Sequence, residues 1–175
     1  MKKENKNTFE AISKVVVSSG LGRIRQTNAQ FDEKSLPDIM AEFADIVGQK
    51  PAVRKAKKSI AGFKVRQNDV VGIAATLRGR RKEDFLTKLT SVVLPRLRDF
   101  RGIPSSRLDG KGNLSIGFKD QSVFPEINPE QSKWNFGLEI TMVVDKNKIK
   151  NIVKGGEDST IDFYRQIGIP LTVNK

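Results

Sequence analysis

Four segments of the chain carry the residue pattern of β-strands. Residues 14–19 form a β-branched run that ends at Gly20-Leu21-Gly22, which is typical of a buried strand entering a tight turn. Residues 70–78 alternate, with Val71, Ile73, Ala75 and Leu77 on one face and Thr76 and Arg78 on the other. The same alternation predicts a strand around residues 114–118 and another at 136–144.

Three further segments show helical spacing of apolar residues. Ser35-Leu36-Pro37-Asp38 has the spacing of a capping box, and a helix is predicted from there to Gly48. A second helix is predicted from about Lys82 to Leu94, ended by Pro95, and a third from about Glu157 to Ile167. The side chains expected to face inward are Ile39, Phe43, Ile46 and Val47 in the first helix, and Phe85, Leu89, Val92 and Val93 in the second.

Strands and helices follow one another in an irregular order, and at least two pairs of strands are close in sequence. This order favours an α+β fold, with a largely antiparallel sheet, helices packed on one face and a long basic loop. The length of 175 residues fits one domain. We therefore expect a polar N-terminal extension at residues 1–13 and a single domain at residues 14–175.

Composition argues against catalysis. The chain has no Cys and no His, so it lacks thiol nucleophiles, disulfides and the commonest general base and metal ligand. The acid pairs Glu83–Asp84 and Glu157–Asp158 are adjacent on predicted helix starts, where the helix dipole explains them. Gly20-Leu21-Gly22 lacks the third glycine of a dinucleotide fingerprint. We expect no catalytic residue, metal or cofactor.

The chain also lacks the signals of membrane insertion and secretion. No run approaches the 18 apolar residues of a membrane span, and residues 1–10 are polar and charged. These features predict a soluble intracellular protein without a membrane partner.

Positive charge is concentrated in one stretch. Between Lys50 and Lys82 the chain has eleven Lys and Arg against a single acid, Asp69, a formal +10 of the net +12. Such a concentration is typical of a polyanion-binding surface, and nucleic acid is the commonest polyanion. The candidate phosphate contacts are Lys50, Arg54, Lys55, Lys57, Lys58, Lys64, Arg66, Arg78, Arg80, Arg81 and Lys82.

Three other side chains near this charge are candidates for direct contact with nucleic acid. Phe63 follows Gly62 in the basic loop, so it can either stack on a base or ribose or pack inward and hold the loop. Gln49 and Thr76 can read base edges or 2′-hydroxyl groups. Charge alone does not distinguish RNA from DNA.

A set of short motifs, in order along residues 14–145, resembles the large-subunit ribosomal protein L5 family. The motifs are Gly48-Gln49-Lys50-Pro51, Ala56 through Arg66, Thr76-Leu77-Arg78-Gly79, Leu94 through Gly102, Asp109 through Asn113, Phe124-Pro125-Glu126-Ile127 and the strand at 137–141. One departure is Ser18-Ser19, where the family has Asn-Met. Another is Leu114, where the family has an aromatic residue after Asn113.

The resemblance implies a non-enzymatic constituent of the large ribosomal subunit that binds 5S rRNA in the central protuberance. It also implies contacts with large-subunit rRNA, with P-site tRNA and with a small-subunit head protein across the intersubunit bridge. The cytoplasm is the expected location, with an organellar ribosome left open. The alternatives are a basic RNA- or DNA-binding architectural protein and a Mg-dependent nuclease.

The resemblance and the charge together give two groups of candidate site residues. The 5S rRNA group is Ser18, Gln49, Lys50, Thr76, Arg78 and Arg80. The loop at residues 57–66 is expected to contact tRNA through Lys57, Lys58, Phe63, Lys64 and Arg66.

Overall fold

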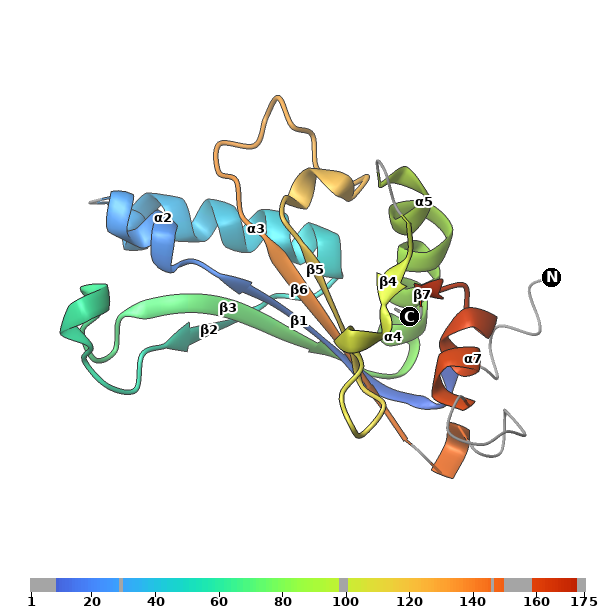
Figure 1. Cartoon of the computed structure of the whole chain (residues 1–175). Helices are drawn as coiled ribbons and strands as arrows, with labels where there is room; N and C mark the ends of the chain where they lie inside the picture. The colour runs from blue at the N-terminus through green and yellow to red at the C-terminus, as the bar shows by residue number, and fades with distance from the viewer. Residues whose placement is uncertain (1–8, 29, 98–100, 146, 150–158, 173–175) are drawn as a thin grey trace. The chain divides into compact units, whose positions relative to one another are not determined.

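The computed structural model describes residues 9–28, 30–97, 101–145, 147–149 and 159–172 (Figure 1). The chain divides into two compact units: residues 1–16, 76–116 and 140–175 form unit 1, and residues 17–75 and 117–139 form unit 2. Several predicted features lie outside the described residues. These are most of the N-terminal extension, the centre of the motif at 94–102, and the acid pair at 157–158.

Five strands form the main sheet, in the order β2-β3-β1-β6-β5. Their bounds are Ile12–Gly20 for β1, Ala52–Lys55 for β2, Val70–Leu77 for β3, Leu114–Phe118 for β5 and Leu138–Val144 for β6. Strands β4 (Ile103–Pro104) and β7 (Leu171–Thr172) form a separate parallel pair. All four predicted strands are therefore present.

Hydrogen bonds between neighbouring strands show that the main sheet is largely antiparallel. Ala52 of β2 pairs with Ala74 of β3, and Arg54 with Gly72. Between β1 and β6, the Ser13 hydroxyl donates to the Val143 carbonyl, whereas the Ser19 hydroxyl donates to the Gly137 carbonyl. Residue numbers therefore increase along β1 in the direction in which they decrease along β6, so the two strands are antiparallel. The predicted α+β class with a largely antiparallel sheet is confirmed.

In unit 2, β1 is followed by the short helix α2 (Gly22–Thr27), and a π-helical turn (Phe31–Ser35) leads into α3 (Leu36–Val47). The inward face predicted for α3 is confirmed, since Ile39, Phe43, Ile46 and Val47 are all buried. Gly48 ends α3 at a φ of +72°, a conformation that favours glycine.

The predicted capping box at Ser35 is wrong. Ser35 has helical backbone angles, is buried and makes no capping hydrogen bond. The π-helical turn supplies the preceding turn of helix, so no free N-terminus remains at Ser35 for a side chain to cap.

In unit 1, α4 (Gly79–Lys88) continues through a second π-helical turn (Leu89–Val93) into α5 (Leu94–Arg96). This helix starts three residues before the predicted Lys82 and includes Pro95 instead of ending there. As a result, Glu83 and Asp84 lie beyond the first turn. The π-helical turn adds a residue to the helical repeat and so shifts which side chains face inward. Val92, which was expected to face inward, is exposed, and Leu94 is buried.

Unit 1 also contains α7 (Ser159–Gln166), which agrees with the third predicted helix over the described residues. The buried Tyr164 of this helix donates a hydrogen bond of 3.0 Å from its hydroxyl to the Gly112 carbonyl. Short 3-10 turns lie at Ala61–Phe63, Ser105–Arg107 and Gln121–Val123.

Strand β3 is buried more completely than its alternation predicts. Val70, Gly72 and Ala74 are buried, although they lie on the face predicted to be polar. Of the predicted apolar face, Ile73, Ala75 and Leu77 are buried, whereas Val71 and the opposite Thr76 are half-buried. Arg78 lies beyond the end of the strand, immediately before α4. Strand β3 lies between β2 and β1 in the sheet, and its small residues fit in this buried position. A Cβ atom on Gly72 would be 2.6 Å from the Ser19 carbonyl oxygen.

We expect Gly72→Ala to lower the free energy of unfolding by about 1–3 kcal/mol, because the added methyl group meets a main-chain atom that cannot move away cheaply. Gly117→Ala is the matched control in the same unit, since a Cβ there has no neighbour within 4 Å. Chemical denaturation of both variants measures the difference. Equal stability of the two variants would show that the sheet relaxes around position 72.

Candidate nucleic-acid interface

The basic stretch folds as a hairpin made of β2, the loop that follows it and the first residue of β3. We call these residues, 52–70, the basic hairpin. Main-chain hydrogen bonds close its neck, where the Ala56 N–H donates to the Asp69 carbonyl at 2.8 Å and the Asn68 N–H to the Ala56 carbonyl at 2.9 Å. At the tip, Ile60 and Val65 exchange two hydrogen bonds of 2.8 and 3.2 Å around the 3-10 turn. The predicted exposed loop is therefore present, with its own internal hydrogen bonds.

The cations of the hairpin point into solvent. Lys57, Lys58, Lys64 and Arg66 are all exposed, and none of them forms an ion pair with another described residue. Asp69, the single acid of the stretch, is already engaged. One carboxylate oxygen lies 2.7 Å from Nη2 of Arg25, and the other accepts the Arg66 N–H at 2.8 Å. The positive charge of the tip is therefore left uncompensated by the described part of the fold.

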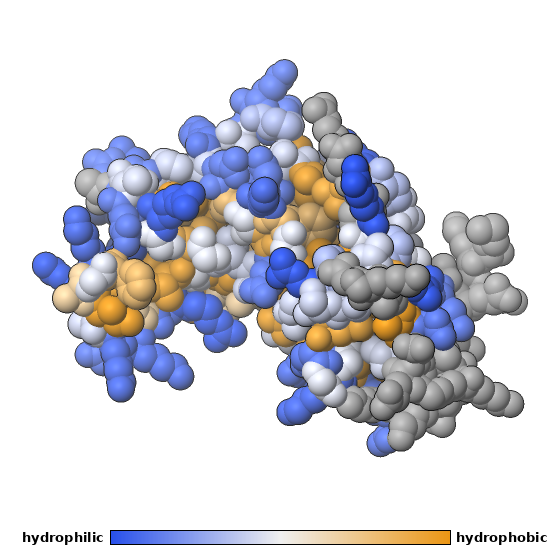
Figure 2. All heavy atoms as spheres, in the orientation of Figure 1, coloured by the Kyte–Doolittle hydropathy of each residue, from blue (hydrophilic) through white to orange (hydrophobic). Residues whose placement is uncertain are grey.

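Phe63 lies at the tip of the hairpin with 68% of its surface exposed, and Ile60 nearby is 50% exposed. Figure 2 shows a small apolar patch at this end of unit 2, with hydrophilic residues around it. The alternative in which Phe63 packs inward is therefore wrong. An exposed ring among cations is the arrangement that stacks on bases in proteins that bind single strands and loops.

The remaining candidates of unit 2 lie outside the hairpin tip. Ser18 is half-buried in β1, whereas the hydroxyl of the buried Ser19 is used within the fold, at 2.7 Å from the Gly137 carbonyl. Gln49 is half-buried and Lys50 exposed, in the segment between α3 and β2. Of the two serines, Ser18 is the one whose hydroxyl the described hydrogen bonds leave available.

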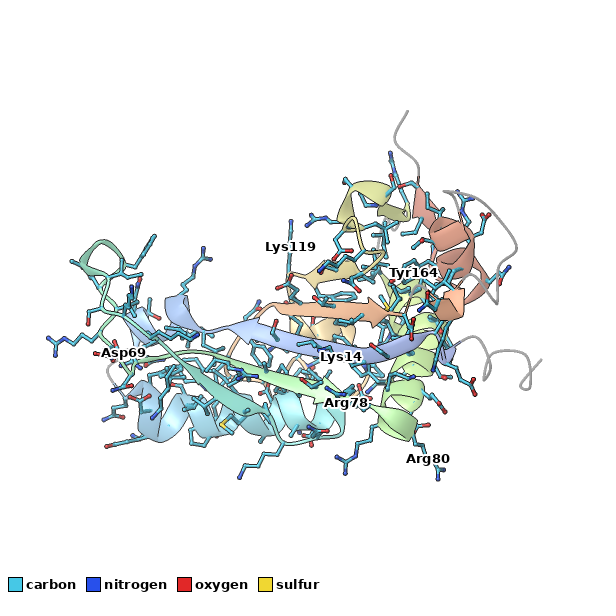
Figure 3. The ribbon with its side chains drawn as sticks, turned by 90° about the horizontal axis from the view of Figure 1, so that it is seen from below. Lys14, Asp69, Arg78, Arg80, Lys119 and Tyr164 are labelled. Carbon is cyan, nitrogen blue, oxygen red and sulfur yellow. The ribbon has the colours of Figure 1, made fainter. Side chains whose placement is uncertain are left out.

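The other candidates, Thr76, Arg78 and Arg80, belong to unit 1. Thr76 is half-buried near the end of β3, and Arg78 and Arg80 are exposed at the start of α4 (Figure 3). Arg80 lies 4.0 Å from Asp84, but both side chains are so exposed that this ion pair contributes little.

Lys14 is a further cation of unit 1 that the charge analysis missed. The Leu21 N–H donates to the Val71 carbonyl, and continuing this antiparallel register along β1 and β3 places Lys14 at the level of Arg78. Figure 3 shows the two side chains near each other. Lys14 lies outside the run from Lys50 to Lys82, so the only signal in the sequence was a cation inside a β-branched strand.

Lys82 is a correction to the candidate phosphate contacts. Its side chain is buried, with 6% of the residue exposed, and its Nζ donates to the carbonyls of Phe9 at 2.9 Å and Ile12 at 2.6 Å. Burial lowers the pKa of this ammonium group, opposed in part by the negative charge of Glu83. Lys82 therefore satisfies main-chain carbonyls at the start of β1 and is not available to RNA.

No group of three or more acids among the described residues could hold a metal ion. The described helices also include none that is long and apolar enough to cross a membrane.

Comparison with known proteins agrees with the resemblance of the motifs. The family model for ribosomal protein L5 matches residues 10–66, and a second model, for the C-terminus of the same ribosomal protein family, matches residues 70–170. The chain belongs to the ribosomal protein L5 family.

Bacterial members of this family are similar over most of the chain. The large ribosomal subunit protein uL5 of Fusobacterium nucleatum is 46% identical over 142 residues, which cover 80% of this chain and 75% of the relative. The uL5 of Aster yellows witches'-broom phytoplasma is 47% identical over 132 residues, which cover 75% of this chain and 70% of the relative. The uL5 of Streptococcus pneumoniae is 46% identical over 136 residues, which cover 78% of this chain and 73% of the relative.

Membership in the L5 family confirms that this is a ribosomal protein and not an enzyme. Its location is the ribosome.

We expect Lys82→Met to lower the free energy of unfolding by about 1–3 kcal/mol, because methionine leaves the carbonyls of Phe9 and Ile12 without their donor. Arg80→Met, two residues earlier on the same helix and exposed, should change stability by less than about 0.5 kcal/mol. Denaturant titration of both variants measures the contrast. An unchanged Lys82→Met variant would mean that the cost of burying the charge cancels its hydrogen bonds.

Proposed function

We propose that this L5 family member binds 5S rRNA in the large ribosomal subunit and contacts P-site tRNA through the basic hairpin. The observation that carries this proposal is the charge state of the hairpin. The loop at residues 57–66 carries four exposed cations and an exposed aromatic ring, and the only acid of the stretch is bound to Arg25 and to the main chain. Large-subunit rRNA and a small-subunit head protein are the further partners that the family leads us to propose.

Binding of this kind rests on phosphate neutralisation. Each Lys or Arg that reaches a phosphate releases condensed counterions, so affinity falls steeply as salt concentration rises. The exposed Phe63 adds stacking, which tolerates any base because every base has an aromatic face. The mechanism is recognition of RNA shape and backbone, without chemistry on the RNA.

Two groups of residues suggest two RNA partners. We assign the polar and cationic candidates outside the hairpin to 5S rRNA: Ser18, Gln49 and Lys50 in unit 2, and Thr76, Arg78 and Arg80 in unit 1. The loop of the hairpin projects beyond the end of β2 and the start of β3. This position would let it contact a second RNA. We therefore assign Lys57, Lys58, Phe63, Lys64 and Arg66 to tRNA.

A DNA-binding architectural role is the rival that charge alone would also support. Competition of labelled 5S rRNA with duplex DNA of equal length separates the two, and we expect the protein to prefer 5S rRNA. With six to ten phosphate contacts, affinity should fall by about three to five decades between roughly 50 and 200 mM salt. Equal affinity for the DNA would contradict the proposed function, and a nearly flat salt dependence would contradict its electrostatic basis.

The two RNA roles can be separated by a charge-neutralised hairpin. We expect the combined variant Lys57→Gln, Lys58→Gln, Lys64→Gln and Arg66→Gln to keep most of its 5S rRNA affinity and to assemble into large subunits. Ribosomes carrying it should release P-site tRNA faster, by about tenfold, because several phosphate contacts are lost.

The matched control for charge neutralises four exposed cations outside the hairpin: Arg107, Lys111, Lys119 and Lys133. It carries the same net charge as the hairpin variant and should release tRNA at the parental rate. If 5S rRNA binding collapsed in the hairpin variant while tRNA release stayed parental, the hairpin would be assigned to the wrong RNA.

A further inference from the structure

Helix α2 has an unusual position for a helix of a folded protein, because none of its six residues is buried. It therefore contributes no apolar side chain to the core. Two of its side chains make polar contacts with the basic hairpin, and these contacts join residues 44 and 37 positions apart in the sequence.

The first of these contacts is made by Arg25. Its Nη2 lies 2.7 Å from Asp69 Oδ1 in an ion pair whose side chains are only 24% and 18% exposed. Asp69 Oδ2 accepts the Arg66 N–H at 2.8 Å, so the carboxylate links α2 directly to the main chain of the hairpin. Phe31, with its ring centre 6.0 Å from the guanidinium, and Asp32, at 3.7 Å, further restrict Arg25.

The second contact is at the tip of the hairpin. Gln26 donates a hydrogen bond of 2.7 Å from Nε2 to the carbonyl of Phe63. Phe63 itself has an exposed ring, so α2 holds its main chain while leaving the side chain open to solvent. Neighbouring residues of one helix therefore hold the neck and the tip of the hairpin at the same time.

These contacts matter because the hairpin repels itself. Its only acid is Asp69, which is already bound to Arg25 and to the main chain, and like charges separated by less than a Debye length favour an opened hairpin. An anchor outside the hairpin opposes this repulsion without covering the cations.

We propose that Arg25 and Gln26 are positioning residues that hold the basic hairpin in its RNA-binding orientation before RNA arrives, with Asp69 as the link. The inference rests on the proposed function of the hairpin. Its consequence is a lower entropic cost of binding, because the hairpin does not have to be ordered by the RNA.

Asp69→Asn is the most informative variant, because two explanations predict opposite results. It raises the positive charge of the hairpin by one, so binding governed by charge alone would hold tRNA more tightly. If Asp69 links the hairpin to α2, the same substitution frees the hairpin, and ribosomes carrying it should release P-site tRNA about three- to tenfold faster.

Amide hydrogen exchange in the free protein tests the positioning role without RNA. In Asp69→Asn and Arg25→Gln, the hydrogen-bonded amides of Ala56, Ile60, Val65 and Asn68 should exchange roughly tenfold faster, as for the loss of a charged hydrogen bond. Gln26→Ala should raise exchange at the tip alone. The double variant of Arg25 and Asp69 should exchange little faster than Asp69→Asn alone, because both substitutions remove the same ion pair.

Arg23→Gln is the matched control, because Arg23 is exposed on the same helix and its side chain makes no hydrogen bond or ion pair with another described residue. It loses the same charge as Arg25→Gln and should leave hairpin exchange unchanged. The positioning role is overturned if hairpin exchange in Asp69→Asn and Arg25→Gln matches this control, or if Asp69→Asn holds tRNA more tightly. A failure of the proposed function would be seen in a different experiment. Ribosomes carrying the variant with four neutralised hairpin cations would then release tRNA at the parental rate.

Discussion

The pairing of β1 on both of its edges is the constraint on which the rest of the structure depends. The strand lies between β3 and β6, so its main-chain groups are taken up by its neighbours and few are left for water. Its ends are completed by side chains. Lys82 donates to the Ile12 carbonyl at the start, and the Ser19 hydroxyl bonds the Gly137 carbonyl near the end.

Much of the fold could be predicted from side-chain periodicity. The inward face of α3 and the alternation of β5 and β6 follow from residues whose burial repeats with the helix or strand period. The errors arise where the period is interrupted. The two π-helical turns are the source of both errors. The first precedes α3 and so leaves no free N-terminus at Ser35, and the second shifts the helical repeat so that Val92 is exposed. The local spacing of apolar residues does not reveal either turn.

The candidate site could be predicted in part for a similar reason. The run of cations predicted a long basic loop, and the hairpin is present there, because charge density is a local property of the sequence. Lys82 was assigned wrongly because charge counting ignores burial, and its carbonyl partners lie 73 and 70 residues earlier. Arg25 and Gln26 were missed because only the folded chain brings them to the hairpin. Asp69 was visible only as the exception to the charge run, and its two contacts explain why an acid is there.

The internal hydrogen bonds of the hairpin involve main-chain groups together with Asp69 and Ser59, whereas Lys57, Lys58 and Lys64 contribute no side chain to them. Under the proposed function, the fold of the hairpin and its affinity for RNA therefore depend on different residues. Exchange of one of these lysines for arginine, or its loss, would then change the attraction to RNA without bringing the protein closer to its stability threshold. The strength of RNA contact could be adjusted in small steps at these three positions while the hydrogen bonds of the hairpin are kept.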